Sequence, residues 1–138
     1  MKVRSERGTA AVEMALLAPV LIVLVAAVVA AGRIVETESA VLSVAREAAR
    51  TAADAPDAAS AYTAAASTAT QVAAGLGLDT SRIVVTQSAG GFGRGEPYRV
   101  SVSYEVRLED LPGLGALPGS FSVSAEHAEL IERFKSRW

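Results

Sequence analysis

The sequence predicts an α+β protein, in which a long apolar helix precedes a second helix and a small antiparallel sheet. An apolar run without any charged residue extends from Met14 to Ala31. Helix-prone, alanine-rich sequence follows it as far as Gly77, and beyond Asp79 apolar and polar residues alternate with the period of a strand. We therefore expect a transmembrane helix that continues outside the membrane, a second alanine-rich helix and three antiparallel strands.

The first expected element is a transmembrane helix over residues 9–32. Between Ala10 and Gly32 the only charged residue is Glu13. At about 1.5 Å per residue such a helix is roughly 30 Å long, which is enough to cross the hydrocarbon core of a bilayer. The helix is expected to continue as far as Asp54, because the first break is the proline at position 56 and the residue before a proline avoids the helical region.

The second helix is expected to begin at Pro56, with Asp57 near its positive end, and to end at Gly75 and Gly77. It is so rich in alanine that it can pack closely against the first helix. The two helices would form an extramembrane region over residues 33–78. The apolar stripe of the second helix is predicted to consist of Tyr62, Ala66, Ala69, Val72 and Leu76.

Residues 79–138 are expected to form a small β-rich C-terminal body. The first strand is predicted over residues 82–88, the clearest alternation of buried and wet side chains covers 98–109, and a shorter alternation covers 121–126. The tail from Glu129 to Trp138 fits either a helix with one apolar face or an extension of the last strand. Its candidate partner contacts are Phe134 and Trp138.

Two glycine-rich segments, 90–95 and 111–115, are expected to form the loops between the strands. The first is similar to a phosphate-binding loop in composition, but it opens no helix and lacks the Lys-Ser/Thr ending. We interpret it as a flexible hairpin loop, in which Phe92 and Arg94 are candidate contacts with a partner.

Composition argues against several classes of function. The formal net charge of −2 does not favour a nucleic-acid partner, which needs a clustered basic face. The chain has no cysteine, and its single histidine, His127, has no cysteine or acidic partner at ligand spacing. No serine lies in a nucleophile motif. We therefore expect no catalytic, cofactor or metal site, no small-molecule substrate and no enzymatic activity.

The residues at the start of the apolar run carry the most specific chemistry. Residues 1–8 form a basic leader, and the positive-inside rule predicts that it stays in the cytoplasm while the C-terminal body lies outside. Gly8 has no Cβ, which lets a peptidase approach the following bond closely. Cleavage there would create an amine at Thr9, one helical turn from Glu13. A carboxylate at mid-membrane costs about 2.5–3.5 kcal/mol, so this amine is its natural partner.

The string Arg-Gly-x-Ala-x-Val-Glu-x-Ala-Leu-x-x-Pro, from Arg7 to Pro19, resembles the TadE-like family. These are pseudopilin-type minor components of the tight-adherence (Flp, type IVb) pilus machinery. The resemblance is strongest over residues 4–32 and extends to the rest only in its pilin-like layout. One departure is Met14, where prepilins of this system often carry an aromatic residue.

The resemblance implies processing by a prepilin peptidase between Gly8 and Thr9, and a role for Glu13 in setting the register of subunits during assembly. The implied partners are the lipid bilayer, other pilin-like subunits, Tad membrane platform proteins and the peptidase. The implied location is the bacterial inner membrane, with a single span.

Other interpretations of the N-terminal region stay open. In one interpretation, Glu13 lies near the lipid headgroups and pairs with Arg7. In another, cleavage after Ala31 removes the apolar run as a signal peptide. The protein would in these cases be an unprocessed single-pass anchor or a secreted binding domain with no role in a pilus.

Overall fold

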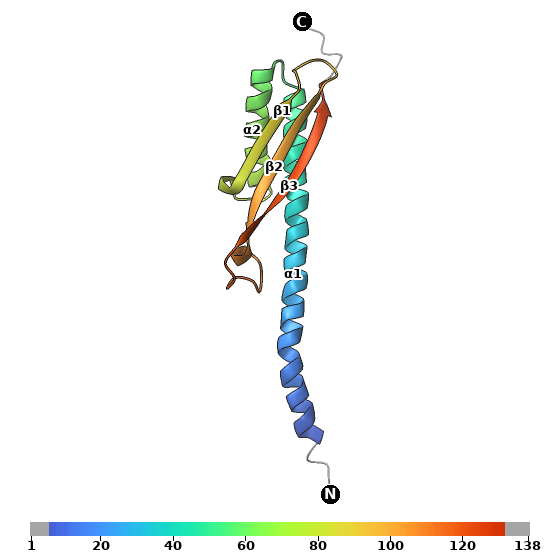
Figure 1. The fold of residues 1–138 in the computed structure, drawn as a ribbon, viewed down its shortest axis with the longest axis vertical. Helices are drawn as coiled ribbons and strands as arrows, with labels where there is room; N and C mark the ends of the chain where they lie inside the picture. The colour runs from blue at the N-terminus through green and yellow to red at the C-terminus, as the bar shows by residue number, and fades with distance from the viewer. Residues whose placement is uncertain (1–5, 132–138) are drawn as a thin grey trace. The chain divides into compact units, whose positions relative to one another are not determined.

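The computed structural model describes residues 6–131 of the 138-residue chain. It confirms the α+β class, with a long N-terminal helix, a second helix and a three-stranded antiparallel sheet (Figure 1). The chain divides into two compact units, which we call the helix–loop unit (residues 1–34 and 107–119) and the sheet unit (residues 35–106 and 120–138). The elements in order are α1 (Glu6–Ala53), α2 (Ala58–Gly75), η1 (Thr80–Arg82), β1 (Ile83–Ala89), β2 (Pro97–Arg107), η2 (Leu108–Asp110) and β3 (Ser120–Leu130).

Helix α1 is continuous and passes through both units, as the absence of a sequence break before residue 56 predicts. It includes Pro19, whose ring nitrogen carries no hydrogen, so the carbonyl of Ala15 loses its usual helical donor. Membrane helices tolerate such a carbonyl when neighbouring groups compensate for it.

The sheet has the strand order β1-β2-β3, and β1 and β2 pair antiparallel from Ile83 opposite Tyr104 to Ala89 opposite Tyr98. Strand β3 extends to Leu130, so the strand alternative for the start of the tail is confirmed and the helical alternative is wrong there. The reason is pairing beyond the strand, where Ile131 donates to the carbonyl of Glu96 and accepts from the amide of Gly95. The candidate contacts Phe134 and Trp138 lie outside the described residues.

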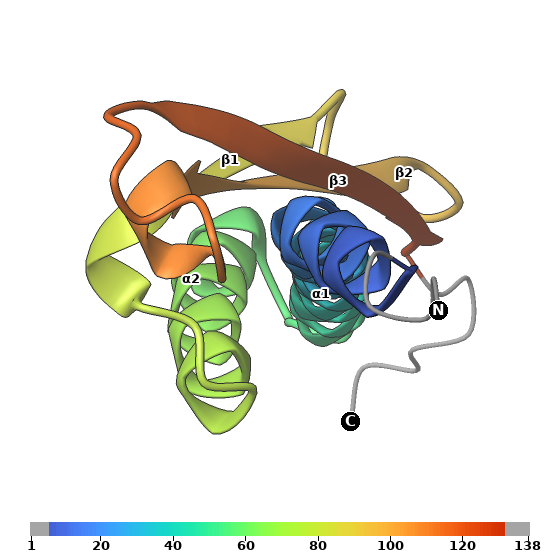
Figure 2. The ribbon, with the colours of Figure 1, turned by 90° about the horizontal axis from the view of Figure 1, so that it is seen from below.

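The core of the sheet unit lies between the helices and one face of the sheet (Figure 2). Every second residue of β2 points into this core, as the alternation in the sequence predicts. Each fully buried valine contributes about 1.5–3 kcal/mol of hydrophobic stabilisation. The largest fully buried side chains are Val41, Val44, Val100 and Val102.

Helix α2 buries a face that only partly overlaps the predicted one. Alanines spaced by four residues form its buried stripe, and Ala69 belongs to both the predicted and the observed stripe, whereas Tyr62 is 61% exposed and Leu76 is 49% exposed. The prediction was wrong for these two residues because it gave the core to the larger apolar side chains. Helices α1 and α2 lie side by side (Figures 1 and 2), and alanine lets two helix backbones approach more closely than larger residues do. The buried residues of α2 are Ala61, Ala65, Ala69 and Ala73.

Both ends of α2 are capped. Asp57 is the N-cap rather than the second residue of the helix, and its carboxylate accepts a hydrogen bond from the amide of Ser60 at 2.9 Å. This bond lowers the pKa of the Asp57 carboxyl below its usual value. At the other end Gly77 adopts a φ of +75°, and the amide of Leu78 donates to the carbonyl of Ala73 at 2.9 Å. This is a Schellman motif, which explains why a glycine follows the helix.

Candidate functional site

The apolar part of α1 is exposed along nearly its whole length. From residue 10 to residue 29 only Ala26 is partly covered, and large side chains such as Leu16 and Val23 are each 68% exposed. Soluble proteins rarely expose so long a continuous apolar surface to water. This is the one helix within residues 6–131 that is long and apolar enough to cross a membrane. Its surface is suited to membrane anchoring.

Glu13 is exposed on this apolar segment. It forms no ion pair or hydrogen bond with any other side chain that the structure describes. Gly8 and Thr9 lie in α1, two and three residues after Glu6, the first residue that the structure describes. Their predicted role in processing and the predicted pairing of Glu13 with a new amine therefore stay predictions, as does the alternative pairing with Arg7.

The loop between β2 and β3, which belongs to the helix–loop unit, lies against the apolar segment of α1. The sequence predicted a loop there but not this contact. Gly113, in the loop between β2 and β3, has a φ of +80°, and a Cβ at this position would lie 2.6 Å from the Cβ of Ala26. Pro112 lines a shallow apolar groove together with side chains of α1. These are Leu21, Ile22, Val25, Ala26 and Val29.

The glycine-rich segment 90–95 forms the loop between β1 and β2, as predicted. Phe92 is half-buried and packs edge-on against Tyr98, with ring centroids 6.1 Å apart, while Arg94 is exposed. The carboxylate of Glu96 accepts a hydrogen bond from the amide of Gly93 at 3.4 Å. Part of the Phe92 ring therefore contacts Tyr98 of the same chain. The roles of Phe92 and Arg94 toward a partner stay predictions.

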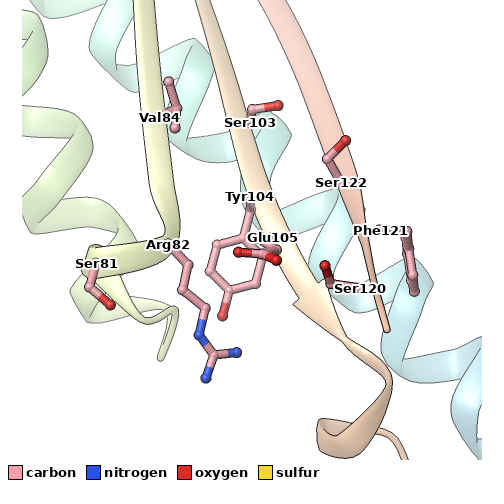
Figure 3. A pocket seen from close by; sticks show the side chains of 9 residues that line it. All are labelled: Ser81, Arg82, Val84, Ser103, Tyr104, Glu105, Ser120, Phe121 and Ser122. Atoms are coloured by element: carbon pink, nitrogen blue, oxygen red, sulfur yellow. The ribbon is translucent and has the colours of Figure 1, made fainter. Parts of the chain in front are cut away.

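A shallow hollow lies at the end of the sheet near η1 (Figure 3). The Arg82 guanidinium pairs with the carboxylate of Asp79 at 3.2 Å, and the amide of Asp79 donates to the Tyr104 hydroxyl at 3.5 Å. The lining residues include four serines and Glu105 but no histidine. The hollow is lined by Ser81, Arg82, Val84, Ser103, Tyr104, Glu105, Ser120, Phe121 and Ser122.

His127 has an acidic neighbour that the sequence analysis did not recognise. Its Nε2 lies 3.4 Å from a carboxylate oxygen of Glu129, because residues two apart in a strand point to the same side. This correction does not create a metal site, since no group of three His, Cys, Asp or Glu residues within 6–131 is placed to hold an ion.

The fold and the exposed apolar segment together define an α+β protein whose N-terminal helix is suited, by its length and composition, to membrane anchoring. Residues 8–50, which are less than half of the chain, match the family model TadE, described as TadE-like protein, and this match confirms the resemblance found in the sequence. Comparisons with curated proteins and with solved structures gave no match. A TadE-like domain indicates a component associated with the Tad pilus, with partners in that system.

Proposed function

We propose that this protein is a minor pilin-like (pseudopilin) component of Tad (type IVb) pilus assembly, without enzymatic activity of its own. In this proposal it is anchored in the bacterial inner membrane with its N-terminus in the cytoplasm and its body outside. A prepilin peptidase removes residues 1–8. The observation that carries the proposal is Glu13, the only charge between Ala10 and Gly32, within a TadE-like domain.

Glu13 needs a partner once α1 is in lipid. A carboxylate at the centre of a bilayer costs about 2.5–3.5 kcal/mol, and less near the surface, so an ionised group there is retained only for a function. The nearest cation that processing creates is the amine of Thr9, four residues away and so about one helical turn along the same side. Pairing with this amine, in the same or a neighbouring subunit, would fix the axial register between subunits.

The residue type at position 8 supports cleavage there. Gly8 lies in α1, two residues after Glu6, the first residue that the structure describes. Glycine is about 0.5–1 kcal/mol less favourable in a helix than alanine, which makes this part of the helix easier to open for a peptidase. Cleavage would leave ten basic and fourteen acidic side chains, a net charge of −4.

The N-terminus of the mature protein tests the processing step. We expect Edman sequencing and intact mass of the protein, purified from membranes of cells with the peptidase, to give Thr9 as the first residue. Met1 would instead support the unprocessed anchor, and Gly32 a secreted domain released from a signal peptide.

A matched pair of glycine variants sharpens this test. Gly8→Val should block cleavage, because it adds a branched Cβ beside the scissile bond. Gly32→Val is the control, since it lies in the same helix and a Cβ there meets nothing within 4 Å. Equal processing of both variants would contradict the role assigned to Gly8.

The assembly role of Glu13 is tested separately. Glu13→Gln keeps the shape of the side chain but removes its charge, and we expect normal membrane insertion with a loss of pili in the sheared fraction. Glu38→Gln, at an exposed position of α1 outside the apolar run, is the control. Normal piliation in the Glu13 variant would refute the proposed pairing.

A further inference from the structure

The loop between β2 and β3 has a regular internal structure. We call residues 108–119 the leucine loop, because leucine occupies every third position from 108 to 117. The amide of Leu111 donates to the carbonyl of Leu108 at 3.1 Å, that of Leu114 to Leu111 at 3.1 Å, and that of Leu117 to Leu114 at 2.8 Å. The amide of Leu108 donates to the carbonyl of Gly119 at 2.9 Å and closes the base of the loop.

These turns give the leucine loop a property suited to an apolar environment. The backbone amides of Leu108, Leu111, Leu114 and Leu117 are satisfied within the loop, which lowers the cost of moving this backbone out of water, where an unpaired amide would lose its hydrogen bond. Leu111 is buried, whereas Leu117 is 52% exposed and available to an outside contact.

The contact with α1 fixes the level of the leucine loop along the helix. Gly113 approaches Ala26 so closely that a Cβ on it would lie 2.6 Å from the alanine Cβ. Ala26 lies five residues before Ala31, the last residue of the uncharged run, which corresponds to about 7.5 Å along the helix axis. When α1 spans a bilayer, the loop therefore reaches below the level at which the apolar run ends. Segments that lie in the interface are buried to a similar depth, roughly 5–10 Å.

We propose that the leucine loop inserts into the membrane interface beside α1 and forms a second, lipid-facing attachment of the protein. The occupant of its exposed apolar side is the acyl-chain boundary of the bilayer. Residues 108–119 contain no lysine or arginine to attract anionic headgroups, and the two acidic residues, Glu109 and Asp110, lie at the start of the loop next to the end of β2, where Glu109 pairs with Arg107 at 3.4 Å. The inference rests on membrane anchoring by α1, and it holds whether or not the leader is cleaved.

The consequence concerns the way in which α1 sits in lipid. A single apolar helix is free to rotate and to shift in depth within the bilayer. A second contact, held to the helix at Ala26, limits both movements. The leucine loop thus sets the depth of the N-terminal carboxylate Glu13, which lies thirteen residues and about 20 Å away along the helix.

Spin-label accessibility in the full-length protein tests the proposal. The chain has no cysteine, so single-cysteine variants can be labelled selectively. Leu117→Cys reports on the leucine loop, Val20→Cys on the middle of the apolar run, and Thr63→Cys on an exposed position of α2. After reconstitution into phosphatidylcholine vesicles, collision rates with oxygen and with a water-soluble nickel chelate give the environment of each label.

We expect the label at residue 117 to collide with oxygen more than with the nickel chelate, as the label at 20 does. A label at 117 that behaves as the one at 63 lies in water and overturns the proposal. Protection from both reagents would show that protein covers the loop, which also overturns it. If the label at 20 lies in water, α1 is not inserted and the proposal falls with the anchoring, whereas an uncleaved leader alone leaves it standing.

The lipid composition separates the acyl-chain boundary from an anionic headgroup. Replacing a third of the phosphatidylcholine by phosphatidylglycerol should change the ratio of collision rates at residue 117 by less than twofold. If the label at residue 117 collided more with oxygen than with the nickel chelate only when phosphatidylglycerol was present, the loop would be held by electrostatic attraction to the headgroups. This result would refute insertion driven by the leucines.

Discussion

The alanine face of α2 offers a sharp test of the packing, at a position that the sequence prediction left outside the core. Ala65 is fully buried, with 0% of its surface exposed. Leucine in its place adds three carbon atoms in a closely packed interface, and overpacking of this kind costs about 1–3 kcal/mol. Alanine and leucine are both strong helix formers, so the change in helix propensity is small.

The expected effect on thermal stability follows from this cost. In a domain of 60–100 residues each kcal/mol lowers Tm by about 4–8 °C, so Ala65→Leu should lower it by roughly 4–24 °C. The measurement is thermal unfolding of the full chain in detergent micelles, followed by circular dichroism. Ala59→Leu, at an exposed position of the same helix, controls for the added surface and should leave Tm within a few degrees.

A third variant decides between the two faces of the helix. Ala66 belongs to the stripe that the sequence predicted but is only half-buried in the structure, whereas Ala65 belongs to the observed stripe. We therefore expect Ala66→Leu to be the milder of the two changes. A larger loss of stability in Ala66→Leu than in Ala65→Leu would refute the assignment of the buried face.

Two further predictions concern a glycine and a tyrosine. Gly113→Ala and Gly77→Ala both place a side chain at a φ near +80°, a strain of about 1–2 kcal/mol, but only Gly113 also meets α1. Gly113→Ala should free the leucine loop, seen as faster motion of a nitroxide at residue 117, and equal motion in the two variants would contradict the contact. Burial raises the pKa of the Tyr98 phenol above its usual value of 10.0, and the hydroxyl donates to Gln87. The contribution of Tyr98 to stability should be constant below pH 10 and fall above it, because the phenol ionises first in the unfolded chain. Tyr98→Phe should flatten this alkaline loss in thermal unfolding from pH 8 to 11.

The elements were predictable from the sequence wherever periodicity and chain breaks are strong. The first helix was expected from residue 9 to residue 54 and is found over Glu6–Ala53. The central strand was expected from its alternation and is found over Pro97–Arg107, with Val100 and Val102 fully buried. These signals are local, since they depend on which side of a helix or strand each side chain points to.

The buried face of α2 was not predictable in the same way. Alanine occurs on every side of this helix, so hydrophobicity alone favoured the larger residues such as Tyr62 and Leu76. The structure buries alanines and leaves Tyr62 61% and Leu76 49% exposed. The deciding factor is how closely a neighbouring backbone can approach, and this depends on the partner element rather than on the helix itself.

The features of the candidate site also differ in how far the sequence predicts them. The position of Glu13 in an uncharged run, and the glycine before it, are properties of the sequence, and they led directly to the TadE-like resemblance. The leucine loop also has a signal in the sequence, a leucine at every third residue from 108 to 117, but a period of three has no meaning for a sheet or an α-helix. It was therefore interpreted as ordinary loop chemistry.

The sequence by itself determined the class of this protein, because an uncharged run of membrane-spanning length and the alternation of a strand are written in consecutive residues. Only the tertiary structure decided which face of α2 is buried and that Gly113 lies against Ala26, eighty-seven residues earlier in the chain. Contacts between residues so far apart depend on the shapes of two surfaces at once, and no single stretch of sequence contains both.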